Sequence, residues 1–272
     1  MKTVERFVVA QMRGFLFLAA LFVLTAMPVW SQTKEQPNTM EKRERTAITF
    51  INVKPEMVPE FENMFKTDIN PALAKGGAKW SNVWKIATFG DAFEYVIVSP
   101  IENFAQYDSP SPMMKGMGKE GTAAWAAKAS KMVNGVRTVA YESRPDMSYD
   151  TKMTAPPKMA VVTLVTVAAG RNAEFENFIK NDWLPVIKQS GVQGYWVSQV
   201  MFGGDVNQYV IVVPHENFAE VDKGNPVSRV LGRDGMMKLQ QKLPAGVITH
   251  QERIISRFMP ELSYRPATTA TK

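Results

Sequence analysis

The residues best suited to chemistry in this chain are two histidines and a short polar run that begins at one of them. His215 and His250 are the only histidines, and His250 opens the run His250-Gln251-Glu252-Arg253. A histidine pair can move protons or bind a metal, but the two lie far apart and show no HxH, HxxxH or HExxH spacing. We therefore predict no metal site. His215, His250, Glu252 and Arg253 are the candidate catalytic residues; the alternative is that the histidines are surface residues and that the polar run protects an edge strand against aggregation.

A second set of candidates could bind a flat organic ligand. Asn82 and Trp84 alternate along one predicted strand and so share a face, while Trp196, Tyr95 and Tyr209 lie in the matching and neighbouring strands. Aromatic side chains beside an amide can line a pocket, but they are equally consistent with core packing. These five residues are the ligand-binding candidates, and both interpretations stay open.

All of these candidates lie within an internal repeat. The motif EFEN at residues 60–63 recurs at 174–177, a shift of 114 residues from Phe61 to Phe175, and YVIV at 95–98 recurs at 209–212. Solenoid repeats have periods of only about 20 to 50 residues, so a period of this length indicates duplicated domains.

Each copy shows the same succession of patterns. An apolar strand is followed by an amphipathic helix, two strands around a Gly-Asp turn, a glycine-containing helical region and a last strand. The predicted strands are residues 47–53, 79–88, 93–99 and 137–143 in the first copy, and 159–167, 192–202, 207–213 and 249–257 in the second.

This order, βαββαβ, is the ferredoxin-like topology, which leaves one face of its sheet bare. An uncovered apolar face needs a partner, and the other copy is the nearest one. We predict an α+β fold in which two tandem ferredoxin-like units pack sheet to sheet as a pseudo-dimeric α/β barrel. Further oligomerisation stays open.

With this order, the segment YVIVxPxENFA at residues 95–105 resembles the dimeric α/β-barrel superfamily, which contains antibiotic-biosynthesis-type monooxygenases and NIPSNAP-like and EthD-like proteins. The resemblance covers nearly all of the chain after the N-terminal leader. It implies a fold and no single function, because the superfamily includes heme degraders, quinone-forming monooxygenases, isomerases and members without known activity.

The heme-degrading members use an asparagine on the first strand, a tryptophan after the third strand and a histidine in the second helix. Asn52 lies near the first of these places. The third strands, however, end in Ser99-Pro100 and Val213-Pro214, and the second helical regions contain no histidine. We therefore predict no cofactor.

Two shorter motifs also recur. Asp68 precedes Pro71 as Asp182 precedes Pro185, and we interpret each proline as a helix break with the aspartate as the cap of the next turn. A general base is the alternative. The glycines of residues 118–121 and 232–235 are interpreted as loosening the second helix.

The N-terminus is typical of a secretory signal. Basic residues precede an apolar run at 15–24, which is shorter than the roughly 20 residues of a spanning helix, and residues 29–31 suit a signal peptidase. We expect cleavage before Gln32, a periplasmic or secreted protein, and no stable membrane anchor after cleavage. An uncleaved anchor is the alternative. The absence of cysteine excludes a lipid-anchored precursor and disulfides.

Composition limits the partners. The formal net charge is +6, but basic and acidic residues are interspersed, so we predict no nucleic-acid partner. The predicted organisation is a signal peptide at 1–31, a disordered spacer at 32–45, the two units at 46–150 and 158–265 around a linker at 151–157, and a disordered tail at 266–272.

We therefore expect an exported protein that binds a small apolar or aromatic molecule, either as a binding protein or as a cofactor-independent oxygenase or isomerase. A non-catalytic structural or protein-interaction module is the alternative. A cavity larger than about 300 Å³ would favour ligand binding.

Overall fold

A computed structural model describes residues 43–153 and 155–266. The predicted signal peptide, most of the predicted spacer and most of the predicted tail lie outside these residues. The described chain runs twice through the order strand, helix, strand, strand, helix, strand. The strands are β1 (Arg45–Val53), β2 (Asn82–Ile86), β3 (Glu94–Ile101), β4 (Val133–Ser143), β5 (Tyr149–Asp150), β6 (Met159–Val167), β7 (Gly194–Phe202), β8 (Gln208–His215) and β9 (Ile248–Phe258). All eight predicted strands are confirmed.

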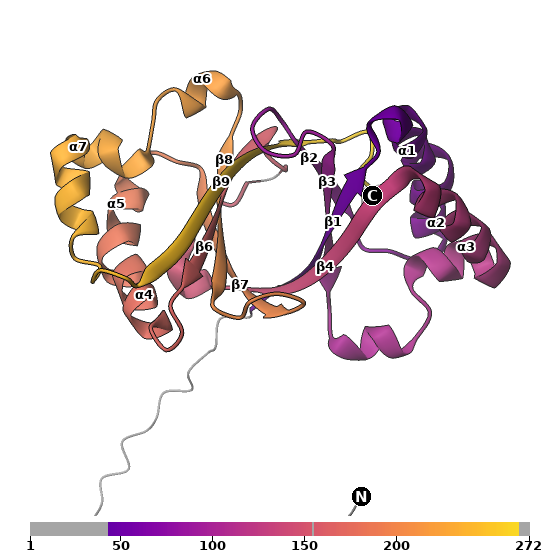
Figure 1. Ribbon diagram of the computed structural model, residues 1–272, viewed down its shortest axis with the longest axis horizontal. Helices are drawn as coiled ribbons and strands as arrows, with labels where there is room; N and C mark the ends of the chain where they lie inside the picture. The colour runs from indigo at the N-terminus through magenta and orange to yellow at the C-terminus, as the bar shows by residue number, and fades with distance from the viewer. Residues whose placement is uncertain (1–42, 154, 267–272) are drawn as a thin grey trace, which may run out of the picture. The chain divides into compact units, whose positions relative to one another are not determined.

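The helices belong to two groups, one in each half (Figure 1). They are α1 (Val58–Met64), α2 (Asn70–Lys75), α3 (Pro112–Met132), α4 (Asn172–Phe178), α5 (Leu184–Gln189), α6 (Phe218–Val221) and α7 (Pro226–Gln240), with short turns η1 (Pro55–Met57), η3 (Phe104–Asp108) and η4 (Pro145–Met147). Two π-helical segments, η2 (Phe65–Ile69) and η5 (Ile179–Trp183), join α1 to α2 and α4 to α5. Within the described residues, no helix combines the length and apolarity that crossing a membrane requires.

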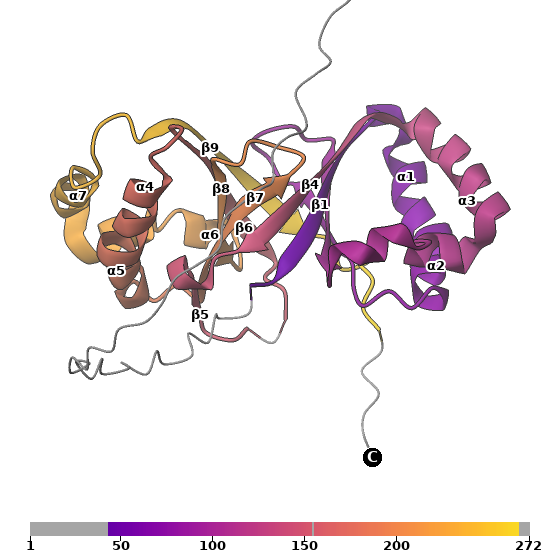
Figure 2. The same ribbon diagram turned by 90° about the horizontal axis from the view of Figure 1, so that it is seen from below.

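The strands form one closed antiparallel barrel. Each half contributes a four-stranded sheet, in the order β4-β1-β3-β2 and β9-β6-β8-β7. Backbone pairing of β2 with β9 and of β4 with β7 joins the two sheets along both edges and closes an eight-stranded barrel. The expected α+β barrel is present, and its halves meet through these hydrogen-bonded edges as well as through the apolar faces turned toward each other (Figure 2).

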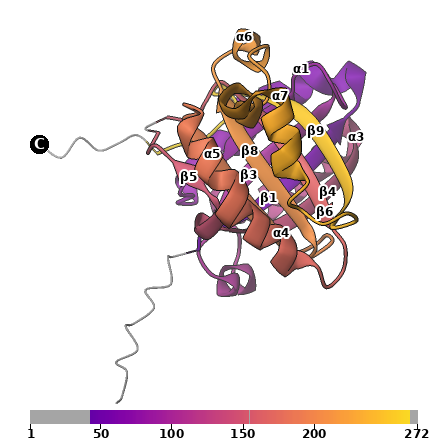
Figure 3. The same ribbon diagram turned by 90° about the vertical axis from the view of Figure 1, so that its left-hand side faces the viewer.

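Alternation along the strands separates the two faces of the sheet. One set of side chains points into the barrel, where Val139, Tyr141, Val200 and Val210 form a buried cluster. The other set points outward under the helices, with α1 to α3 over the first half (Figure 1) and α4, α5 and α7 over the second (Figure 3). The barrel centre is thus packed with side chains, and space for a ligand has to be sought beneath the helices.

Each half also receives a short arm from the other. After β4, the chain crosses to the second half, where Arg144 N donates to Val197 O at 2.8 Å and Met147 is fully buried. After β9, the chain crosses back, where Met259 N donates to Val83 O at 2.9 Å and Leu262 is buried. The two arms tie the halves together beyond the barrel edges.

The predicted capping role of the repeated aspartates is wrong. Neither α2 nor α5 has a side-chain cap, because each continues from a π-helical turn without a break. The carboxylates bind lysines of the next helical region instead, with Asp68 3.2 Å from Lys128 and Asp182 2.7 Å from Lys242. The prediction for the glycines holds, since Gly118 and Gly232 adopt φ of 76° and 71° and kink α3 and α7.

Candidate functional site

A cavity of about 450 Å³ lies between the sheet and the helices of the second half. Its volume falls within the range of about 300 to 1,000 Å³ that is typical of small-molecule sites. Its walls come from strands β6 to β9, from α4, η5 and α5, and from the segment around α6 and α7. The lining residues are Val161, Thr163, Val165, Phe175, Phe178, Ile179, Trp183, Ile187, Tyr195, Ile211, Val213, His215, Val221, Gly224, Asn225, Pro226, Gln240, Leu243, Ile248, Gln251, Arg253 and Ile255.

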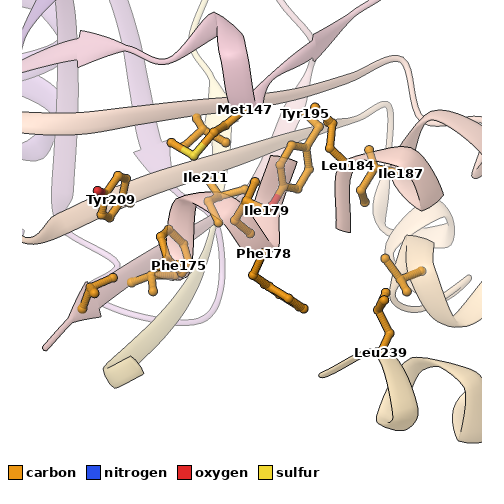
Figure 4. Packing of buried hydrophobic residues seen from close by; sticks show 14 of the residues in the cluster. Met147, Phe175, Phe178, Ile179, Leu184, Ile187, Tyr195, Tyr209, Ile211 and Leu239 are labelled. Carbon is orange, nitrogen blue, oxygen red and sulfur yellow. The ribbon is translucent and has the colours of Figure 1, made fainter. Parts of the chain in front are cut away.

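Most of this lining is apolar and comes from helices and strands. Figure 4 shows Phe175, Phe178, Ile179 and Ile187 on helical segments and Tyr195 and Ile211 on strands. Alternation explains the strand contribution, because Val161, Val165 and Ile255 lie on the outward face of adjacent strands. The aromatic walls suit a flat or apolar ligand.

The second half has larger residues where the first half has glycines between its helices, and this difference explains why a cavity fits beneath the helices of the second half. In the first half, α3 lies directly on α2: a Cβ at Gly116 would lie 2.0 Å from Ala72 O, and one at Gly76 would lie 1.7 Å from Pro112 O. Under the 114-residue shift, these two glycines correspond to Val230 and Ser190. Side chains of that size exclude such a close approach, so α7 has to stand farther from α5.

The π-helical segment η5 supplies part of the wall. Its residues Ile179 and Trp183 both line the cavity, and Trp183 packs against Phe178 with ring centroids 5.9 Å apart. A π-helical turn inserts one residue into a helix and is frequent at functional sites. The same turn in the first half, η2, contributes Phe65 and Ile69 to a closed core instead.

Few polar groups reach the cavity. His215 lies at the end of β8, and burial lowers its pKa below the ordinary value, which favours the neutral imidazole; Glu220, 3.9 Å away, acts in the opposite direction. Arg253 lies on β9, and its Nε donates to Thr163 Oγ1 at 3.4 Å. No aspartate or glutamate lines the cavity.

A buried ionic network supports the cavity wall. Tyr209 stacks against the cavity residue Phe175 at 4.8 Å and donates to Glu176 Oε1 at 2.8 Å. Arg144, from the arm after β4, binds both oxygens of Glu176 and both oxygens of Asp146. Its hydrogen bonds hold the pKa of Glu176 below the ordinary value even though burial opposes this.

The first half has a related but weaker arrangement. Tyr95 donates to Glu62, and Lys85 Nζ lies 3.3 Å from Glu62 and 4.8 Å from the centre of the Tyr95 ring. Burial raises the pKa of both Tyr95 and Tyr209. The tyrosines are therefore protonated donors to a carboxylate and have no contact with the cavity.

The structure brings only two of the predicted catalytic residues to the cavity, His215 and Arg253. His250 and Glu252 are exposed and lie on the other side of β9, opposite Thr166 and Leu164. Burial is the main cause of the raised pKa of Glu94; Asp91 and Glu252 raise it further, whereas Arg137 lowers it. These residues lie at one end of the barrel, away from the cavity.

The predicted ligand-binding residues lie outside the cavity lining. Trp196 faces Val212 on the barrel side of β7. Trp84 packs on Phe258 at 5.1 Å, and the Asn82 side chain accepts from Arg265 Nη2 at 3.1 Å. Tyr195, the neighbour of Trp196, lines the cavity instead. Strand alternation shows that one member of each such pair faces the helices, but it does not show which face will have space.

The described residues hold no cluster of three or more His, Cys, Asp or Glu side chains that could bind a metal ion. Asn52, at the place of the heme-degrader asparagine, binds Asp91 and accepts from Asn134 Nδ2 at 2.8 Å. Asn103 and Asn217 of the repeated ENFA motif accept from the backbone of Gln106 and Glu220, each at 3.2 Å. The motif behind the resemblance thus serves the scaffold.

Comparison with known proteins supports the fold alone. No protein-family model and no curated protein matches the chain. A candidate monooxygenase from Fusobacterium nucleatum aligns with a TM-score of 0.56 at 12% identity, covering 84% of this chain and 97% of that one. A candidate monooxygenase from Lactobacillus acidophilus aligns at 0.53 and 9% identity, over 82% and 97%. An anthrone oxidase-like protein aligns at 0.54 and 10% identity, over 80% and 92%. The chain therefore has the barrel fold of monooxygenase-like proteins.

Proposed function

We propose that this protein binds a small, largely apolar organic molecule in the cavity of its second half. The observation that supports this most directly is the cavity of about 450 Å³ itself, lined by aromatic and aliphatic side chains with a few polar groups at its margin. Such a combination is the usual form of a small-molecule site. A purely structural module would have no reason to keep this volume open.

We infer further that the bound molecule is oxidised by dioxygen without a cofactor. The fold is that of monooxygenase-like and anthrone oxidase-like proteins, and a neutral His215 on the cavity wall could accept a proton from an acidic C–H or O–H of the ligand. In the reaction of an anthrone, one oxygen atom enters the ligand as a ketone and the other leaves as water.

Three wider parts of the proposal rest on the sequence. The signal-like N-terminus supports export, and the 114-residue shift supports a tandem duplication of a ferredoxin-like unit. Membership of the dimeric α/β-barrel superfamily is supported by the same repeat and by the barrel topology. Each half supplies the other's barrel edges, so one chain does what two subunits of a dimer would do.

Binding is tested by tryptophan fluorescence with neutral two-ring aromatic compounds such as 2-naphthamide. Because Trp183 lines the cavity, binding should change the emission, and Trp183→Phe should remove that change. Val213→Phe fills the cavity and should abolish binding. Val206→Phe on an exposed hairpin (54% exposed) is the matched control. Unchanged emission and melting across the compounds would contradict the proposal.

Oxidation is tested by oxygen uptake and anthraquinone formation with anthrone, corrected for the rate without protein. His215→Gln and Val213→Phe should each reduce the rate to the background, while Val206→Phe should leave it unchanged. If the His215 variant keeps the full rate, the histidine is not the base. If wild-type protein binds anthrone without any uptake, the protein is a binding protein.

A further inference from the structure

We propose that the ligand of the second-half cavity is an organic anion, whose negative group is held at the rim by Arg253. This inference rests on the proposed ligand-binding function and specifies the chemical class of the ligand. Charge, geometry and the comparison between the two halves each support it.

The charge on the cavity wall is one-sided. Arg253 is the only lining residue with a permanent charge, and no carboxylate lines the wall beside it. His215 is either neutral or positively charged, so it adds no negative charge. An arginine with no carboxylate on the same wall gives a positive potential there. A ligand with a negative group at one end is the complement of this wall.

Arg253 is also placed unusually for a surface arginine. It lies opposite Thr163 on the outward, helix-facing side of the sheet, near Val161 and Val165 of β6 and Ile255 of its own strand. Although its side chain is exposed, Arg253 thus lies beside apolar residues of the cavity wall. In the described residues, Arg253 has no ion pair, so its charge is available to a ligand.

The one hydrogen bond of Arg253 leaves its recognition edge free. Its Nε donates to Thr163 Oγ1 at 3.4 Å, which orients the guanidinium group on the cavity wall. The terminal nitrogens, which form the bidentate edge that matches a carboxylate, have no partner among the described residues. The aromatic lining beneath the rim would then hold the apolar part of the same molecule.

The first half gives an internal comparison. The positions that correspond to Thr163 and Arg253 are Thr49 and Thr138, whose hydroxyl oxygens lie 2.9 Å apart and satisfy each other. In that half the helices α2 and α3 are in direct contact through Gly116 and Gly76. The unpaired arginine thus occurs in the half that has the cavity.

The test compares two probes of nearly equal shape, 2-naphthoate and neutral 2-naphthamide, by calorimetric titration at low ionic strength. Wild-type protein should bind the carboxylate about tenfold more tightly, which corresponds to about 1.4 kcal/mol. Arg253→Gln should remove this preference and leave the affinity for the amide unchanged. Arg257→Gln, on the same face of β9 and outside the cavity lining, should retain it.

Added salt should reduce the preference in wild-type protein, because Arg253 is exposed at the rim. The anion inference fails if wild-type protein binds both probes equally, or if the preference survives in Arg253→Gln; amide binding would then still support a ligand cavity. If wild-type protein binds neither probe, the proposed function fails and the anion inference fails with it. Melting curves of the exposed-site variants check that each is folded.

Discussion

Removing Arg144 should destabilise this protein more than removing any comparable charge in the first half. Arg144 is 4% exposed and binds two carboxylates, that of Glu176 in the second half and that of Asp146 on its own arm. Arg144→Met keeps most of the side-chain volume but leaves both carboxylates without this partner. Lys180, 2.7 Å from Asp146, still offsets part of the loss.

Breaking one side of a buried ion pair costs about 3 to 5 kcal/mol. The lower figure fits here, because Lys180 remains and Asp146 has a side-chain exposure of 33%. For a domain of this size, about 3 kcal/mol corresponds to a fall in melting temperature of about 6 to 12 °C. The loss should also loosen the arm that carries Met147 into the second core.

The matched control is Lys85→Met. Lys85 binds Glu62 beneath Tyr95 in the first half, but the two side chains are 27% and 29% exposed. A pair of this exposure contributes about 1 kcal/mol or less. Scanning calorimetry and urea unfolding at pH 7 measure both variants. If Arg144→Met costs no more than Lys85→Met, the buried network does not stabilise the fold as argued.

The pH dependence gives an independent check. Burial alone would raise the pKa of Asp146, but hydrogen bonds from Arg144 and Lys180 outweigh it and lower the pKa; that of Glu176 is also lowered. Groups with a depressed folded-state pKa stabilise the protein above their unfolded pKa, about 4, and lose this effect as the pH falls. The stability difference between wild-type protein and Arg144→Met should therefore be full at pH 7 and shrink below about pH 4. A constant difference would refute the ionic origin.

Two further predictions concern packing and protonation. Gly116→Val should lower the free energy of unfolding by about 3 kcal/mol, because its Cβ would lie 2.0 Å from Ala72 O and overpack the helix contact. The control is Gly135→Val, since a Cβ at Gly135 has nothing within 4 Å. Equal melting temperatures of the two variants would contradict the close helix contact. If His215 is the base of anthrone oxidation, its lowered pKa keeps it neutral to a lower pH than free imidazole, so the rate should fall only below about pH 6.5. A rate that already halves above pH 7 would exclude this residue.

The sequence predicted the barrel because its information on strands is local and repeated. The apolar run YVIV at 95–98, repeated at 209–212, defines two equivalent strands, and both lie at the expected place as β3 and β8. The edge pairings β2–β9 and β4–β7 were harder to predict, because they depend on how far each sheet twists. No residue pattern in a single strand carries that information.

The site was harder to predict than the fold, since a cavity is a property of packing. Aromatic residues and polar runs suggested Trp196 and His250, yet these point to the barrel side or to solvent. We attribute the helix spacing that allows the cavity to Val230 and Ser190. Neither residue belongs to a catalytic or ligand-binding motif, so the sequence alone does not mark them as part of a site. Only the distances at Gly116 in the other half show what these two residues exclude.

The comparison of the two halves changes which sequence differences matter. A difference between the copies can alter ligand chemistry only where there is space for a ligand. Glu252 replaces Arg137 of the first copy outside the cavity lining, whereas Arg253 replaces Thr138 on the cavity wall. Between the helices of the second half, Val230 and Ser190 stand where the first half has Gly116 and Gly76. In a duplicated fold, larger side chains between the helices of one copy can therefore hold these helices apart and leave space for a ligand beneath them.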